Sequence, residues 1–174
     1  MKRAALFACL FATTSPAFAQ APAATGGPIT NQAERDAIAV RVRGGTACAN
    51  CDLFQIDLPY QSIAGRDFSG ARIRQANLSV AIADRARFQG ANLSLTNFFG
   101  ARLSGADLTD ANLEGATFVG AYLGGARMRG AILDGANFSG AELADAVGLT
   151  QAQLNTACGD AATTLPQGMT IPAC

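Results

Sequence analysis

The sequence predicts an all-β fold in which short extended sides wind into a solenoid, with a short helical cap at each end. Three observations lead to this prediction. Alanine recurs every fifth residue from Ala71 to Ala146, interrupted only by Thr96. A large apolar residue stands two positions after nearly every one of these alanines. Segments with helix-like sequence occur only outside this region, at 31–40 and 151–157.

The spacing of five matches neither the helix period of 3.6 residues nor the strand period of 2. In an extended segment, residues two positions apart point to the same side, so each alanine and its large partner face one interior. Glycine often follows two residues later, as at Gly90, Gly105 and Gly115, and suits a turn. Four such sides closing into a square form a coil of about 20 residues, and the coils stack backbone to backbone.

Residues twenty apart are therefore expected to lie above one another, with the large residues forming interior ladders. The predicted core includes Leu93, Phe98, Leu103, Leu113, Phe118, Leu123 and Phe138. On the outside, one column carries alternating charge through Asp67, Arg87, Asp107 and Arg127. We interpret this column as a series of solvent-exposed ion pairs, which are modest stabilisers.

The repeated unit resembles that of the pentapeptide-repeat family, which is written A(D/N)LxG. The similarity is seen in Ala91-Asn92-Leu93-Ser94, Ala106-Asp107-Leu108-Thr109 and Ala111-Asn112-Leu113-Glu114-Gly115, and it extends over residues 51–146. The resemblance implies a right-handed quadrilateral β-helix. At the usual spacing between strands, the shaft is expected to be about 23 Å long.

The first residues have the layout of a secretory signal peptide. A cationic start at Lys2-Arg3 precedes an apolar stretch, and Ala17-Phe18-Ala19 offers a cleavage site after Ala19. The sequence thus predicts a signal peptide over 1–19 and a periplasmic or secreted protein. A flexible leader and N-terminal cap are expected at 20–50, the repeat at 51–146 and a C-terminal cap at 147–174.

Composition excludes several classes of function. The chain has 13 Lys+Arg, 13 Asp+Glu and no His, so it lacks the basic excess that drives phosphate-dominated binding of nucleic acids. After cleavage, 11 Arg and 13 acidic residues leave a net charge of −2. We expect no transmembrane segment, because no apolar run reaches about 18 residues. With no histidine and no catalytic motif, we expect no enzymatic activity, metal or cofactor.

Four cysteines remain after cleavage, which favours disulfides in an exported protein. Cys48 and Cys51 precede the shaft, and Cys158 and Cys174 follow it. A disulfide needs Cα atoms within about 7 Å, so we predict the pairs Cys48–Cys51 and Cys158–Cys174. A redox centre at Cys48 and Cys51 is the alternative to a structural staple. A zinc knuckle is disfavoured because the other ligands lie far away.

Exposed apolar residues indicate a candidate interaction surface. Phe99 and Val119 replace the usual polar residue in one outward column, and Leu95 and Tyr122 are expected nearby, together with Tyr60 and Val80. Such a patch marks an interface unless the flanking tails cover it.

The leading hypothesis is a non-enzymatic exported scaffold that presents a surface to an unidentified protein or envelope partner. A homodimer is a further possibility. The resemblance also implies a second function, because cytoplasmic family members mimic DNA and protect DNA gyrase or topoisomerase. The near-neutral charge and the export signal of this chain depart from the pattern of those DNA mimics. The third hypothesis is a thiol redox protein that acts through Cys48 and Cys51.

Overall fold

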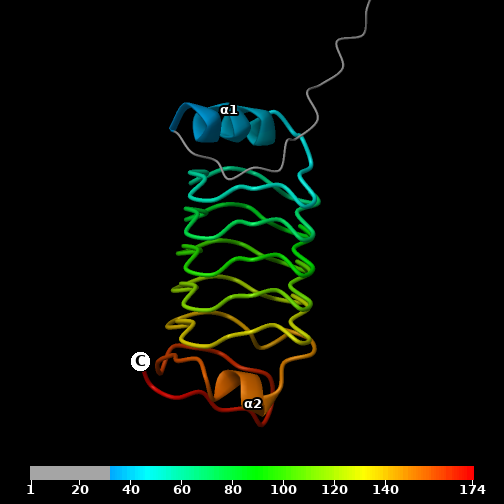
Figure 1. Ribbon diagram of the computed structural model, residues 1–174. Helices are drawn as coiled ribbons and strands as arrows, with labels where there is room; N and C mark the ends of the chain where they lie inside the picture. The colour runs from blue at the N-terminus through cyan, green and yellow to red at the C-terminus, as the bar shows by residue number, and fades with distance from the viewer. Residues whose placement is uncertain (1–31) are drawn as a thin grey trace, which may run out of the picture.

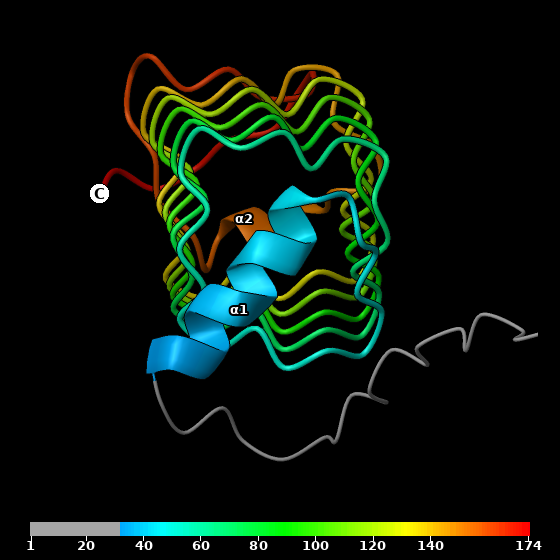
Figure 2. The ribbon, with the colours of Figure 1, turned by 90° about the horizontal axis from the view of Figure 1, so that it is seen from above.

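A computed structural model of the chain describes residues 32–174 as a four-sided shaft with a helix at each end (Figure 1). Helix α1 spans Gln32–Arg43, and helix α2 spans Gln151–Leu154. Between them, isolated parallel bridges join residues twenty apart, from Asp52 and Arg72 at one end to Arg127 and Val147 at the other. Figure 2 shows the stacked coils in outline as a square. The predicted β-solenoid is thus confirmed.

Each side of a coil is one bridged residue flanked by two-residue turns, so no side grows into a longer strand in the described part. The backbone of one side illustrates the pattern. The amide of Phe98 donates to the carbonyl of Thr117 at 2.8 Å, and the amide of Thr117 donates back to Thr96 at 3.0 Å. Every side therefore links its coil to the next by regular hydrogen bonds.

The interior contains the alternating small and large side chains that the spacing predicts. All of the predicted core residues are 0% exposed. The rings of Phe98, Phe118 and Phe138 stack at successive centroid distances of 4.9 Å, with interplanar angles of 5° and 4°. Thr96, which replaces alanine, is tolerated because its hydroxyl donates to the carbonyl of Ile73 at 2.7 Å.

Helix α1 lies across the open N-terminal end of the shaft (Figure 2). It ends at Arg43, three residues later than expected, and Val42 is buried against the interior. Two arginines fasten it. Arg43 donates to the carbonyl of Asp57 at 3.0 Å, and Arg66 donates to the carbonyl of Val42. The helix continues to Arg43 because this last turn has partners in the first coil.

The opposite end is closed by α2 and the C-terminal tail. The hydroxyl of Thr150 accepts from the amide of Gln153 in a capping box, as expected for this start. The helix is shorter than the predicted span of 151–157. It ends at Leu154 because the chain must become extended again for Cys158 to pair with Asn137.

The predicted signal peptide at 1–19 and the first part of the leader, through residue 31, lie outside the described residues.

Candidate interaction surface

Four apolar side chains gather on one edge of the shaft, which we call the apolar corner: Tyr60, Val80, Phe99 and Val119. Tyr60 is 74% exposed, Phe99 is 52% exposed and Val80 is 41% exposed, whereas Val119 is half-buried. Backbone hydrogen bonds hold the layers in register. The amide of Val80 donates to Phe99 at 2.7 Å, and that of Gly100 donates to Val119 at 2.9 Å.

The backbone of this corner is strained in its N-terminal half. Tyr60 and Val80 have φ of 60° and 55°, in the left-handed region where the later coils carry Gly100 and Gly120. For a β-branched residue such as Val80 this conformation is a true outlier, and such strain persists only where the surroundings impose it. The corner therefore keeps two large apolar side chains in a conformation that glycine would adopt without cost.

Leu95 and Tyr122 do not join this corner, so the expectation that they lie beside Phe99 is wrong. Leu95 is 48% exposed on the preceding corner, where its side chain covers Gly115. Tyr122 is 38% exposed on the following side, and its ring extends over Gly124, away from the apolar corner. The expected neighbours Tyr60 and Val80 do belong to the corner. Neither α1 nor the C-terminal tail covers its three most exposed residues.

The column of alternating charge consists of separate ion pairs. In each pair an arginine contacts the aspartate one coil before it. Arg127 lies 2.8 Å from Asp107, and Arg87 contacts Asp67. The hydrogen bond from Arg87 is the main reason that the pKa of Asp67 is lowered to about 2. Burial opposes ionisation of Asp107, but hydrogen bonds from Thr109 and Arg127 outweigh it and lower its pKa. Both aspartates are therefore stabilised in the ionised form, as expected for ordinary salt bridges.

Comparison with known proteins supports the assignment of the fold. The family model for pentapeptide repeats matches eight copies, over residues 67–98, 96–135, 111–147 and 121–158. The chain belongs to the pentapeptide-repeat family. Among curated proteins, none matches this pentapeptide-repeat protein.

Solved structures of other pentapeptide-repeat proteins are similar. Rfr23 from the cyanobacterium Cyanothece 51142 is 23% identical, covers 78% of this chain and 99% of its own, and has a TM-score of 0.60. A trypsin-treated form of QnrB1, a plasmid-mediated fluoroquinolone resistance protein, is 22% identical over 70% of this chain and 62% of its own, with a TM-score of 0.58. A protein from the Arabidopsis thaliana thylakoid lumen is 35% identical over 45% of this chain and 65% of its own, with a TM-score of 0.33. The first two likenesses show the shared fold alone.

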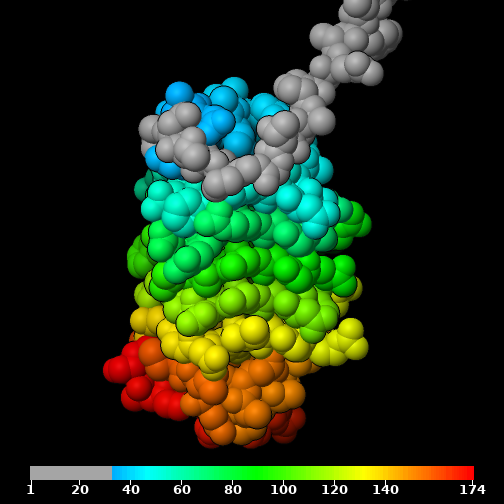
Figure 3. Space-filling model, viewed as in Figure 1, coloured from blue at the N-terminus to red at the C-terminus, as the bar shows by residue number. Residues whose placement is uncertain are grey.

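The pentapeptide-repeat shaft is closely packed, and one face shows continuous layers of side chains (Figure 3). A cavity near α1 has a volume of about 10 Å³ and is lined only by apolar residues, so it has room for at most about one water. An open depression of about 400 Å³ lies outside, where Arg102 and the amide of Ser104 already bind the carboxylate of Asp84. Neither of these two hollows is both enclosed and polar.

Within residues 32–174, no group of three or more potential metal ligands occurs. None of the helices in this described part is long and apolar enough to cross a membrane.

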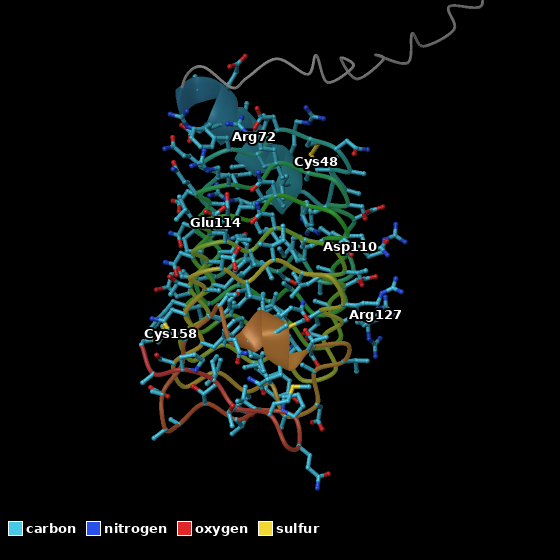
Figure 4. All side chains as sticks on the ribbon, turned by 60° about the horizontal axis from the view of Figure 1, so that its bottom comes forward. Cys48, Arg72, Asp110, Glu114, Arg127 and Cys158 are labelled. Carbon is cyan, nitrogen blue, oxygen red and sulfur yellow. A yellow bond between two sulfur atoms is a disulfide. The ribbon has the colours of Figure 1, made fainter. Side chains whose placement is uncertain are left out.

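Both predicted disulfides are present, at opposite ends of the shaft (Figure 4). The Cα atoms of Cys48 and Cys51 are 5.3 Å apart, and those of Cys158 and Cys174 are 4.8 Å apart. Cys48 is 7% exposed, so one sulfur of the CxxC motif is largely shielded from a redox partner. The second bond fixes the tail beside the last coil, where the amide of Cys174 donates to Gly159 at 3.0 Å.

Proposed function

We propose that this pentapeptide-repeat protein is a non-enzymatic exported scaffold, a right-handed β-helix whose apolar corner binds a protein partner of the cell envelope. The observation that carries the proposal is the exposure of Tyr60, Val80 and Phe99 on adjacent layers of one edge. Contiguous exposed apolar side chains favour protein contacts, and aromatic residues are enriched at interfaces.

Two properties of the shaft support binding rather than catalysis. Hydrogen bonds between successive layers fix the spacing of the corner side chains, so little conformational entropy is lost on docking. On a neighbouring side, the charge of Arg102 is occupied in an ion pair with Asp84. The partner is therefore expected to bury the aromatic rings and to leave this pair exposed to solvent.

The two alternatives have less support. A thiol redox role needs an accessible sulfur, and Cys48 is largely buried. DNA mimicry needs a strongly negative surface, whereas aspartates here alternate with arginines along the column of Asp67, Arg87, Asp107 and Arg127. Neither alternative accounts for the apolar corner.

The test is capture of partners from envelope extract by the chain from Gln20 onward, beside the double variant Phe99→Asp/Val119→Asp. The matched control is Ile132→Asp, which places the same charge on another side at a residue that is 46% exposed. Thermal unfolding verifies that all three proteins are folded. Each captured protein is then identified, purified and titrated against the three forms.

We expect one partner to bind the parent and the Ile132→Asp control with equal affinity and the corner variant at least about tenfold more weakly. A partner that binds all three forms equally contradicts the assignment of the corner. Substrate turnover by the purified protein that survives mutation of the corner contradicts the non-enzymatic proposal.

A further inference from the structure

The edge that carries Leu95 has a charge pattern of its own. It consists of the turn pairs 54–55, 74–75, 94–95, 114–115 and 134–135, one from each coil, and we call it the charged corner. The amide of Gln75 donates to Ser94 at 2.9 Å, and that of Leu95 donates to Glu114 at 2.8 Å. These bonds fix successive layers about 4.8 Å apart.

Positive charge lies at the N-terminal end of this corner and negative charge at the C-terminal end. Arg74 is one coil before Leu95 and Glu114 is one coil after it, and all three side chains are exposed. Neither Arg74 nor Glu114 takes part in an ion pair within residues 32–174. Figure 4 shows Glu114 on the outside of the shaft. The two charges thus flank an exposed apolar side chain at equal distances along the shaft.

The next layer outward differs between the two sides of Leu95. In the first coil, the guanidinium of Arg72 lies 4.6 Å from the centre of the Phe54 ring, but it is also paired with the carboxylate of Asp52 at 2.7 Å, so this layer adds little net charge to the corner. In the fifth coil, the corner carries the exposed carboxylate of Asp134. The charge therefore reverses sign about the layer of Leu95, from Arg74 one coil before it to Glu114 and Asp134 in the two coils after it.

We propose that a second copy of this chain docks antiparallel on the charged corner and forms a two-fold symmetric dimer. A two-fold axis perpendicular to the shaft at Leu95 places Arg74 of each copy against Glu114 of the other. It also brings the two Leu95 side chains together and sets Asp134 of each copy near the ion pair of Arg72 with Asp52 of the other. In a parallel pair, Arg74 would face Arg74, so the charges select the antiparallel arrangement.

A second copy is the occupant that this pattern specifies, because a surface complementary to itself is a requirement of isologous contacts. A different protein would need no reversal of charge about a midpoint. The sides next to the corner carry uncharged Asn97 and Asn112 close to the midpoint, so the antiparallel approach brings no like charges together there.

The contact is a narrow edge, so we expect weak and salt-sensitive association. An interface area at the low end of the specific range is typical of weak, transient association. Exposed charge pairs lose most of their attraction when the Debye length falls to about 3 Å at 1 M salt. Dimerisation is therefore strongest at low ionic strength and high protein concentration.

The experiment is sedimentation equilibrium of the purified protein, expressed from the full sequence without engineered truncation. Protein concentration is varied from about 10 μM to 1 mM, at low and at high salt. The variants are Arg74→Glu, Glu114→Arg and the double exchange Arg74→Glu/Glu114→Arg. The matched control is Arg129→Glu, which makes the same charge change on another corner at an exposed arginine. Circular dichroism verifies that each variant is folded.

We expect each single reversal to weaken dimerisation at least about tenfold, the double exchange to restore it and the control to leave it unchanged. A parent chain that is monomeric at every concentration overturns the proposal. So does a folded double exchange that fails to dimerise, or a dimer that survives both single reversals. The corner variant Phe99→Asp/Val119→Asp should dimerise like the parent, so this proposal and the one on the apolar corner fail independently.

Discussion

Replacing Phe118 by Leu is expected to destabilise the protein more than the same change at Phe138. Phe118 stacks on two rings at 4.9 Å, whereas Phe138 stacks on one, at the end of the ladder. Both side chains are fully buried, so each substitution removes similar apolar area. The difference in the free energy of unfolding then reflects one stacked pair, worth about 0.5–1.5 kcal/mol.

The assay is urea unfolding followed by circular dichroism, with Phe118→Leu, Phe138→Leu and the double variant. The double variant closes a cycle that isolates the pair. Leu123→Ala, at another fully buried core position, shows what a cavity without aromatic stacking costs. Equal destabilisation by the two single substitutions, together with a coupling energy of zero, would refute the view that stacking adds to burial in this core.

Three further predictions concern the surface and the ends. Tyr60→Asn should raise the free energy of unfolding by about 0.5–1 kcal/mol in urea melts, because asparagine tolerates the left-handed backbone better than tyrosine does. Little burial is lost, since Tyr60 is 74% exposed. A loss of stability would contradict this prediction. The pKa of Asp67 falls from 3.8 to about 2 in the folded protein, chiefly through Arg87. Its stabilising effect is therefore present above pH 4 and lost as the pH falls toward 2, and Asp67→Asn should flatten the dependence of the urea midpoint on pH in that range. The double variant Cys158→Ser/Cys174→Ser removes a link between residues 16 apart and should lower the free energy of unfolding by about 3 kcal/mol, because the unfolded chain gains freedom. An unchanged urea midpoint would contradict this.

The sequence predicted the features that follow from a fixed register. Once the period of five places residues twenty apart on one line, the stacking of Phe98 on Phe118 needs no further information. The disulfides followed from the separation of the cysteines into two ends. Leu95 was misplaced because it precedes Phe99 by four residues, and that distance along the chain spans a whole side of the square.

The attachment of α1 was not predicted, because it depends on contacts between the helix and the first coil. Arg66 stands where later units carry alanine, and this departure was the one signal in the sequence. The structure explains why Arg66 replaces alanine, because its guanidinium extends toward α1 and donates a hydrogen bond to the carbonyl of Val42. Arg43 gave no comparable signal, because its acceptor is a backbone carbonyl, which any residue provides.

The bridges between residues twenty apart also determine how this molecule can change in length. An insertion of twenty residues adds one layer, lengthens the shaft by about 4.8 Å and leaves every column continuous. An insertion of five residues acts as a rotation instead, because it moves all later side chains onto the next side of the square. Two insertions that differ only in size therefore have different effects. One separates the surface residues further along the axis, and the other turns half of the surface by a quarter of a revolution relative to the rest.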